Sequence, residues 1–223
     1  MRITVNGVSL YYEVTGNGPA MILLHGNGED HRIFDRAADY LKQRFTLYLV
    51  DSRGHGESSP VSTYHYQDMA DDLAEFIRKL NLEKPVILGF SDGGIVGLIY
   101  ASQYPDGLSH LFACGANTRP ETLKGLGMAF LRMRRPDDPK VRMMLTEPDL
   151  TPEILSRITV PVTVVAGSRD CVDRRDTEFI ASSVQNGKIV IMARSGHSGY
   201  IVHSTRIVDA VFSELGTDAG SGL

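Results

Sequence analysis

The sequence predicts an α/β protein with a mostly parallel, doubly wound sheet that begins with an antiparallel hairpin. Three observations lead to this fold class. The first residues alternate apolar and polar side chains around a turn dipeptide, short unbroken apolar runs follow at intervals, and segments of helical periodicity separate those runs. The chain of 223 residues is long enough for one sizeable core and short for two.

Residues Arg2–Val14 are predicted to form the hairpin. Ile3 and Val5 alternate with polar residues, and Asn6 and Gly7 form a dipeptide that favours a tight turn between antiparallel strands. After this segment the alternation of apolar and polar residues stops, and short unbroken apolar runs follow, as is typical of a parallel sheet.

Six short apolar runs are predicted strands, since unbroken runs of this length suit strands buried on both faces of a parallel sheet. They are Ala20–Leu24, Thr46–Val50, Pro85–Leu88, Leu108–Cys114, Val160–Ala166 and Lys188–Met192. Between the runs, apolar residues at helical spacing predict helices over Tyr66–Leu80 and Asp92–Tyr104, and a last helix from near Ser204 to Leu215. This alternation of strand and helix is typical of a doubly wound domain.

A stretch of about 43 residues, 117–159, contains no strand-like run and is predicted to be a helical insertion between two strands. A helical stripe and a fresh helix start at Thr151-Pro152 support this prediction. The stripe consists of Leu123, Leu126, Phe130 and Met133. The predicted organisation is a core of residues 1–116 and 160–216, the insertion, and a frayed tail over 217–223.

The composition excludes several classes of protein. The chain contains 23 Lys and Arg against 27 Asp and Glu, which gives a formal charge of -4. Proteins that bind nucleic acid or an anionic membrane surface are typically basic, so this charge argues against both functions. The longest apolar stretches run to about ten residues, too short for a membrane span. The N-terminus lacks the apolar segment of a signal peptide. We therefore expect a cytoplasmic protein without nucleic-acid partners.

A G-x-S-x-G pattern stands where a predicted strand meets a predicted helix. It runs from Gly89 to Gly93 and has Ser91 at its centre. A serine at such a sharp turn must take up a strained conformation, and the flanking glycines let strand and helix approach each other. Ser91 is therefore the candidate nucleophile. The competing interpretation is a serine that only caps the helix.

A serine hydroxyl is a weak nucleophile, so this interpretation requires a base and an orienting acid farther along the chain. Two strand ends supply them. Asp170 follows the predicted strand that ends at Ala166, and His197 follows the one that ends at Met192. Asp173 lies three residues beyond Asp170 and is the alternative carboxylate.

The loop after the first buried strand reads His25-Gly26-Asn27-Gly28, and its small residues leave backbone N–H groups free. Acyl transfer needs such groups to bind the oxyanion that forms when a nucleophile attacks a carbonyl. The backbone amides of Asn27 and Asp92 are the expected oxyanion hole.

On these motifs the sequence resembles the α/β-hydrolase superfamily, over nearly the whole chain. Ser, Asp and His follow in the order of this superfamily, and Asp51–Ser58 is similar to the D-x-R-G-x-G-x-S loop of its ester-hydrolysing members. The resemblance implies Ser91 as nucleophile, His197 as general base and then acid, and Asp170 as the orienting carboxylate. It also implies that 117–159 is a cap over the active site, although a short one.

Other residues near these motifs have simpler interpretations. The Asp92 carboxylate is expected to point away from the oxyanion and to complement the positive end of the helix, with attraction of a cationic substrate as the alternative. His25 is expected to shape the oxyanion loop, and Cys171 to be a small buried filler. Four methionines of the insertion are expected to pack its helices rather than to line the substrate site. They are Met128, Met133, Met143 and Met144.

No metal site is predicted, because the histidines show no ligand spacing, and no organic cofactor is implied. The predicted function is a serine hydrolase that cleaves a small carboxylic ester through an acyl-enzyme intermediate. The alternatives are a thioester, amide or C–C bond hydrolase of the same fold, and a ligand-binding or signalling protein with slow turnover. Because the insertion is short, we expect it to cover the active site only in part and to leave it comparatively open.

Overall fold

The computed structural model describes residues 1–124, 133 and 137–216. The strands are β1 (Arg2–Val5), β2 (Val8–Gly16), β3 (Ala20–Leu24), β4 (Thr46–Val50), β5 (Val86–Phe90), β6 (His110–Cys114), β7 (Pro161–Gly167) and β8 (Asn186–Met192). The α-helices are α1 (Asp35–Leu41), α2 (Tyr66–Lys79), α3 (Asp92–Gln103), α5 (Pro139–Thr146), α6 (Pro152–Leu155), α7 (Arg174–Ser183) and α8 (Arg206–Glu214). Two short 3-10 helices are η1 (His31–Phe34) and η2 (Pro120–Thr122).

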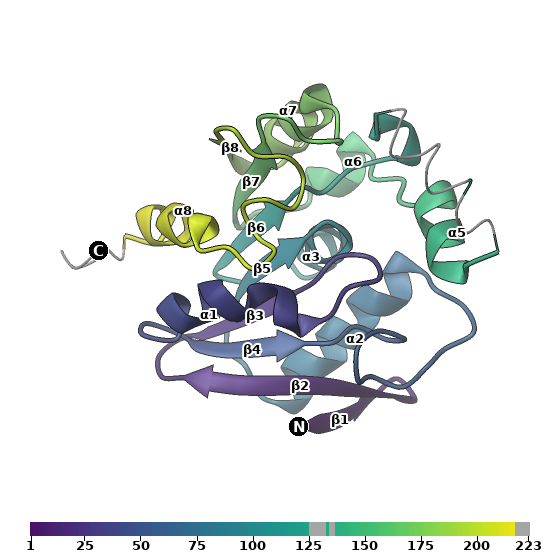
Figure 1. The fold of residues 1–223 in the computed structure, drawn as a ribbon, viewed down its shortest axis with the longest axis vertical. Coiled ribbons are helices and arrows are strands. Elements are labelled where there is room, and N and C mark those ends of the chain that lie inside the picture. Colours follow the sequence, from purple (N-terminus) through teal and green to yellow (C-terminus); the bar gives the residue numbers. More distant parts are fainter. Residues whose placement is uncertain (125–132, 134–136, 217–223) are drawn as a thin grey trace.

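In the described residues, eight strands form one sheet in the order β1-β2-β4-β3-β5-β6-β7-β8 (Figure 1). The β1–β2 and β2–β4 pairs are antiparallel, and the other neighbouring pairs are parallel. The hairpin turns at Asn6 and Gly7, whose φ angles of 45° and 79° are those of a left-handed turn. The predicted α/β fold class is confirmed.

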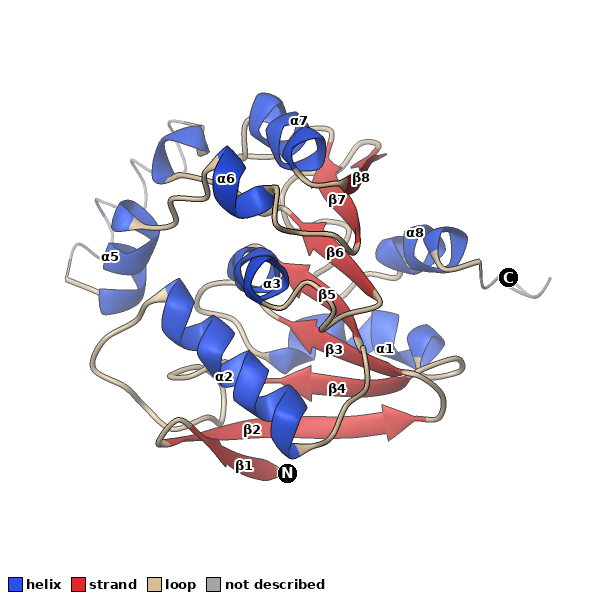
Figure 2. Ribbon diagram, turned by 180° about the vertical axis from the view of Figure 1, so that it is seen from behind, coloured by secondary structure: helices blue, strands red, loops and turns tan. Residues whose placement is uncertain are grey.

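Helices cover both faces of the sheet, so its central strands are apolar on both sides (Figure 2). Ile22 and Leu24 of β3 belong to the core beneath α2 and α3. Met21 and Leu23 of the same strand belong to the core beneath α1 and α8. All four side chains are buried, which explains the unbroken apolar run in the sequence.

The predicted elements agree closely with the observed ones. β3 and β4 have the predicted bounds, and the other strands predicted from apolar runs differ at their ends by one or two residues. Helices α1 and α7 were not predicted. In α7 the buried face is narrow, and Ile180 and Ala181 are its buried apolar residues, so charged side chains conceal the helical stripe.

The segment 117–159 contains η2, α5 and α6 in its described part. Leu123 does not lie in a helix but pairs with Val172 in an isolated antiparallel bridge, so the predicted helical stripe is wrong at this residue. Met133 is 84% exposed, so the prediction that it packs the helices of the insertion is wrong for this residue. The other two stripe residues, Leu126 and Phe130, lie outside the described residues, as do Met128 and the tail 217–223. The division into core, cap and tail therefore stays a prediction.

The order of the strands places a switch point between β3 and β5. The chain runs from β3 to β4 on one side, and then crosses back to β5 on the other side of β3. Loops at the carboxyl ends of two such strands diverge and leave room for a ligand. The loops after β7 and β8 emerge at the same edge, because these strands are parallel to β3 and β5. Among the described residues, no helix combines the length and apolar character that a membrane span requires.

Candidate active site

Ser91 joins β5 to α3 in a strained turn, with φ 51° and ψ -113°. Two glycines make this turn possible. A Cβ added at Gly89 would lie 2.2 Å from the carbonyl oxygen of Gly93, and one added at Gly93 would lie 2.2 Å from that of Leu24. Strand and helix can therefore approach only because these positions lack side chains, which is the requirement of the G-x-S-x-G pattern.

The structure brings Ser91, His197 and Asp170 together from three loops. His197 Nε2 lies 3.1 Å from Ser91 Oγ, and His197 Nδ1 lies 2.7 Å from Asp170 Oδ1. Backbone N–H groups of Gly167 and Val172 donate to the two oxygens of Asp170 over 3.0 and 3.1 Å. The imidazole can therefore donate from Nδ1 to a fixed carboxylate while Nε2 faces the serine hydroxyl.

The pair of Asp170 and His197 stabilises its own charged form. Burial lowers the pKa of His197, but the hydrogen bonds and charges of its neighbours, foremost Asp170, outweigh burial and raise it. Burial raises the pKa of Asp170, but the hydrogen bond and charge of His197 outweigh it, so the net shift is downward. The pair therefore favours an imidazolium next to a carboxylate, which is the state that forms when histidine takes a proton from serine.

Asp173, the alternative carboxylate, lies elsewhere. It is the N-cap of α7, and its side chain accepts hydrogen bonds from the backbone and guanidinium of Arg175. Asp170, which holds His197, is the carboxylate that the fold delivers to the imidazole. Of the two candidates from the sequence, the structure therefore brings Asp170 into the site.

Asn27 and Asp92 flank Ser91 from two different loops. The side-chain amide of Asn27 donates to Asp92 Oδ2 over 2.9 Å, and also to the carbonyl oxygen of Lys140 over 3.4 Å. Asp92 is the first residue of α3, so its backbone N–H is one of the four that a helix leaves without an intrahelical acceptor. Asn27 lines the same cavity as Ser91, and Asp92 directly follows Ser91, so the two residues expected to carry the oxyanion donors lie near the serine.

The Asp92 carboxylate is buried, with 4% of the residue exposed. Its oxygens accept hydrogen bonds from Asn27 Nδ2 and from the hydroxyl of Tyr66, the latter over 2.8 Å. Burial raises the pKa of Asp92 to about 6, although these hydrogen bonds lower it. Because both oxygens already have protein partners, the side chain suits a role in joining loops better than direct contact with a cationic substrate.

His25 and Glu29 hold the loop after β3. His25 Nδ1 lies 2.7 Å from the carbonyl oxygen of Gly26, and its Nε2 accepts the backbone N–H of Ser52 over 3.0 Å. Burial lowers the pKa of His25, which favours the neutral ring that these two bonds require. Glu29 accepts the backbone N–H of Gly26 over 3.0 Å. His25 therefore has the structural position that the sequence predicts.

A cavity of about 230 Å³ opens onto Ser91 and His197. Its other lining residues are Gly26, Asn27, Glu29, Phe90, Asn117, Leu123, Met144, Cys171 and Ser198. A larger hollow of about 660 Å³ lies against α2 and α3 and is lined by charged residues and two tyrosines. That hollow contains none of the residues of the Ser91 cluster, so we take the smaller cavity as the substrate site.

The cavity corrects two predictions. Cys171 is half-buried and lines the cavity, so it is not a buried filler. Met144 also lines the cavity, whereas Met143 is buried in the core, so the two methionines have different roles. The sequence carried no local signal for these contacts. The roles of Glu29 and Tyr66 were also missed, although Glu29 directly follows the glycine-rich loop.

Two groups in the described residues could offer three ligands to a metal ion. They are Asp170 with Cys171 and His197, and Asp30 with His31 and Asp51. His31 shows no ligand spacing in the sequence, because Asp51 lies 20 positions away and contacts it only in the fold. In the second group Asp51 already accepts hydrogen bonds from His31 and the backbone of Glu57, and Asp30 pairs with Arg32.

Comparison with known proteins gives matches over most of the chain. The model of a family described as alpha/beta hydrolase fold matches residues 19–142. The chain is 27% identical to the serine hydrolase BPHL of Homo sapiens, over 88% of this chain and 79% of that protein. It is 26% identical to the AB hydrolase superfamily protein YisY of Bacillus subtilis, over 92% of this chain and 94% of that protein.

A solved esterase from Exiguobacterium antarcticum has a similar fold. It superposes with a TM-score of 0.83 over 96% of this chain and 98% of that chain, at 21% sequence identity. At this identity the likeness concerns the fold alone.

Proposed function

Because the chain belongs to the alpha/beta hydrolase fold family, and is therefore a hydrolase of that fold, we propose that it cleaves small carboxylic esters with Ser91 as nucleophile. One observation carries the proposal: His197 lies within hydrogen-bonding distance of both Ser91 Oγ and Asp170 Oδ1. This is the arrangement that turns a weak serine hydroxyl into a nucleophile.

In the first half-reaction, Ser91 Oγ attacks the carbonyl carbon of the ester while His197 Nε2 takes the serine proton. The carbonyl electron pair moves to oxygen, and the backbone N–H groups of Asn27 and Asp92 bind the resulting oxyanion. When this electron pair re-forms the carbonyl double bond, the bond from the carbonyl carbon to the leaving oxygen breaks, and His197 protonates the departing alcohol. Asp170 keeps the ring oriented and stabilises its positive charge. The product is acyl-Ser91.

In the second half-reaction, water takes the place of serine as the nucleophile, and the same steps follow. His197 takes a proton from water, the hydroxide attacks the acyl carbon, and the same N–H groups bind the oxyanion. The bond to Ser91 Oγ then breaks, and the serine recovers its proton from His197. The carboxylic acid leaves, and the enzyme needs no cofactor for either half.

The cavity supports a small substrate. Its volume of about 230 Å³ and the apolar side chains of Phe90, Leu123 and Met144 suit a short acyl group. The name of the human relative, a serine hydrolase, supports the same reaction class. The proposal includes a cytoplasmic location and a monomer or homodimer. The net charge of -4 supports the absence of nucleic-acid partners.

The test is hydrolysis of p-nitrophenyl acetate by the wild type, Ser91→Ala and the matched control Ser182→Ala, whose serine is exposed on α7. We expect Ser91→Ala to lose at least ~10³-fold in kcat/KM and the control to keep the wild-type rate. A fluorophosphonate should label Ser91 in the wild type. Activity retained in Ser91→Ala would refute the proposal.

The same assay separates the alternatives. A higher kcat/KM for a thioester, an amide or a C–C bond substrate than for p-nitrophenyl acetate would assign the activity to that other bond. Fluorophosphonate labelling with only a single burst of product would favour a ligand-binding protein with slow turnover.

A further inference from the structure

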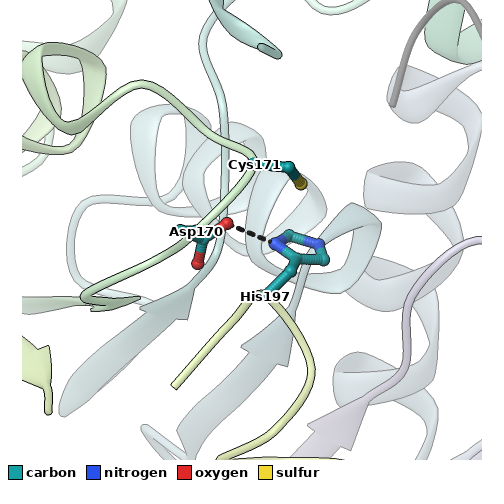
Figure 3. Close-up of side chains that lie close together, drawn as sticks. All are labelled: Asp170, Cys171 and His197. Carbon is teal, nitrogen blue, oxygen red and sulfur yellow. Dashed lines mark hydrogen bonds and ion pairs between the residues drawn. The ribbon is translucent and has the colours of Figure 1, made fainter. Parts of the chain in front are cut away.

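Cys171 places a thiol beside the proposed catalytic pair. It directly follows Asp170 in the loop after β7, whereas His197 comes from the loop after β8. Figure 3 shows the sulfur beside the His197 ring, whose Nδ1 is joined to Asp170 by the dashed line. A carboxylate oxygen, a sulfur and an imidazole nitrogen all lie within 4.8 Å of one another.

The surroundings leave one side of this cluster accessible. The Phe90 ring packs against the His197 ring with a centroid distance of 5.0 Å. At Gly115, an added Cβ would lie 2.8 Å from His197 Cε1, so backbone also covers the ring closely. Cys171 and His197 both line the cavity, so a small ion can reach the sulfur and the ring from the substrate side.

The chemistry of these donors fits a zinc ion. Zinc is bound in proteins by thiolate, imidazole and carboxylate, whereas calcium and magnesium prefer oxygen ligands alone. Zinc bonds of about 2.0 to 2.3 Å place tetrahedral ligand atoms roughly 3.5 Å apart. Donor atoms within 4.8 Å of one another reach that arrangement by side-chain adjustments of about an ångström.

We propose that Asp170, Cys171 and His197 form an inhibitory binding site for zinc beside the substrate cavity, which Cys171 and His197 line and behind which Asp170 is buried. On binding, the Cys171 thiol and the ring nitrogen of His197 that faces the ion each give up the proton they carry to solvent, and the thiolate and the neutral imidazole bind the ion, without any change of oxidation state. The ion occupies His197 and Asp170, so His197 is no longer available to Ser91. The inhibition rests on the proposed function, whereas the binding does not.

Binding is tested first without any enzymatic assay. Co²⁺ replaces Zn²⁺ as a probe, because a thiolate bound to Co²⁺ gives a charge-transfer absorption. We expect this absorption in the wild type and in Ser91→Ala, and its loss in Cys171→Ala, which still contains Cys114. Circular dichroism checks that each variant is folded. Absence of the band in the folded wild type, or its persistence in Cys171→Ala, overturns the proposal.

Inhibition is tested second, with Zn²⁺ added to p-nitrophenyl acetate assays of the wild type and Cys171→Ser. Each rate is divided by the rate of the same variant with a chelator present, so a change in basal activity does not affect the comparison. We expect Cys171→Ser to need at least about tenfold more zinc for half-inhibition. Equal sensitivity overturns the inhibitory role. If the wild type hydrolyses no ester, the proposed function fails, while the Co²⁺ spectra still decide the metal site.

Discussion

The side chain of Asn27 is hydrogen-bonded to the carboxylate of Asp92 over 2.9 Å, which ties the loop after β3 to the first turn of α3. These two residues carry the backbone N–H groups that we propose as the oxyanion hole. Tyr66 donates to the same carboxylate from α2. The two residues that carry the proposed oxyanion donors are therefore held together by side chains, and not only by the backbone.

This bond predicts the effect of charge at Asn27. Asn27→Asp places a second carboxylate against the buried Asp92, so we expect kcat to fall by on the order of 10²-fold at pH 8. The pKa of Asp92 is about 6 in the wild type, and the variant raises it further, because it removes the Asn27 hydrogen bond and adds a like charge. Activity relative to wild type should therefore recover as the pH falls from 8, with a midpoint above 6. Asn27→Ala removes the bond without adding charge and should lose activity equally at both pH values. A loss in Asn27→Asp that does not vary with pH would show that the two side chains do not interact.

Asp170 and Asp173 give a matched pair of variants. Asp170→Asn removes the charge that orients His197, so kcat should fall by ~10⁴-fold. Asp173→Asn should leave hydrolysis unchanged, because Asp173 caps α7 and asparagine is an equally good cap. Steady-state kinetics on p-nitrophenyl acetate measure both. A larger loss of kcat in Asp173→Asn than in Asp170→Asn would show that Asp173 is the carboxylate that orients His197.

The pH dependence of kcat/KM should show the base. His197 accepts the serine proton only when the imidazole is neutral, and its pKa lies above the ordinary value of about 6.5. Activity should therefore fall as the pH drops, with a midpoint above 6.5. Asp170→Asn should move the midpoint down, because the carboxylate no longer stabilises the imidazolium.

The Asp92→Asn variant distinguishes His197 from the other group that titrates in this range. It should keep the acid limb of the profile, because Asp92 contributes its backbone N–H and not its carboxylate. A profile that stays flat down to pH 4, or an acid limb that disappears in Asp92→Asn, contradicts the assignment to His197.

Glu29 predicts a preference for substrate charge. Its carboxylate lines the cavity close to Ser91, and burial raises its pKa while the Gly26 N–H and His197 lower it. Glu29→Gln keeps an acceptor for Gly26 but removes the charge. We expect the ratio of kcat/KM for anionic over cationic esters to rise on the order of tenfold, or about 1.4 kcal/mol. Glu178→Gln, on the exposed face of α7, is the control. An unchanged ratio would show that Glu29 only holds the loop.

The candidate site was predictable where the evidence for it is local. The turn at Ser91 depends on glycines within two residues of it, and Asp170 and His197 each stand shortly after an apolar run. By contrast, Leu123 continues a helical stripe in the sequence but pairs with Val172, because a neighbouring loop offers it a strand-like partner. The periodicity of residues near Leu123 in the sequence contains no information about a partner from a distant loop.

The sequence by itself determined the strands, the helices α2, α3 and α8 and the motifs at the strand ends, because burial on both faces of the sheet leaves unbroken apolar runs and sharp turns require glycine. Only the tertiary structure decided that Asp170 and not Asp173 meets His197, that Cys171 lines the cavity, and that Asn27 holds Asp92 across 65 positions of chain. These contacts join loops from different strands, and their distances depend on how the whole sheet packs and twists.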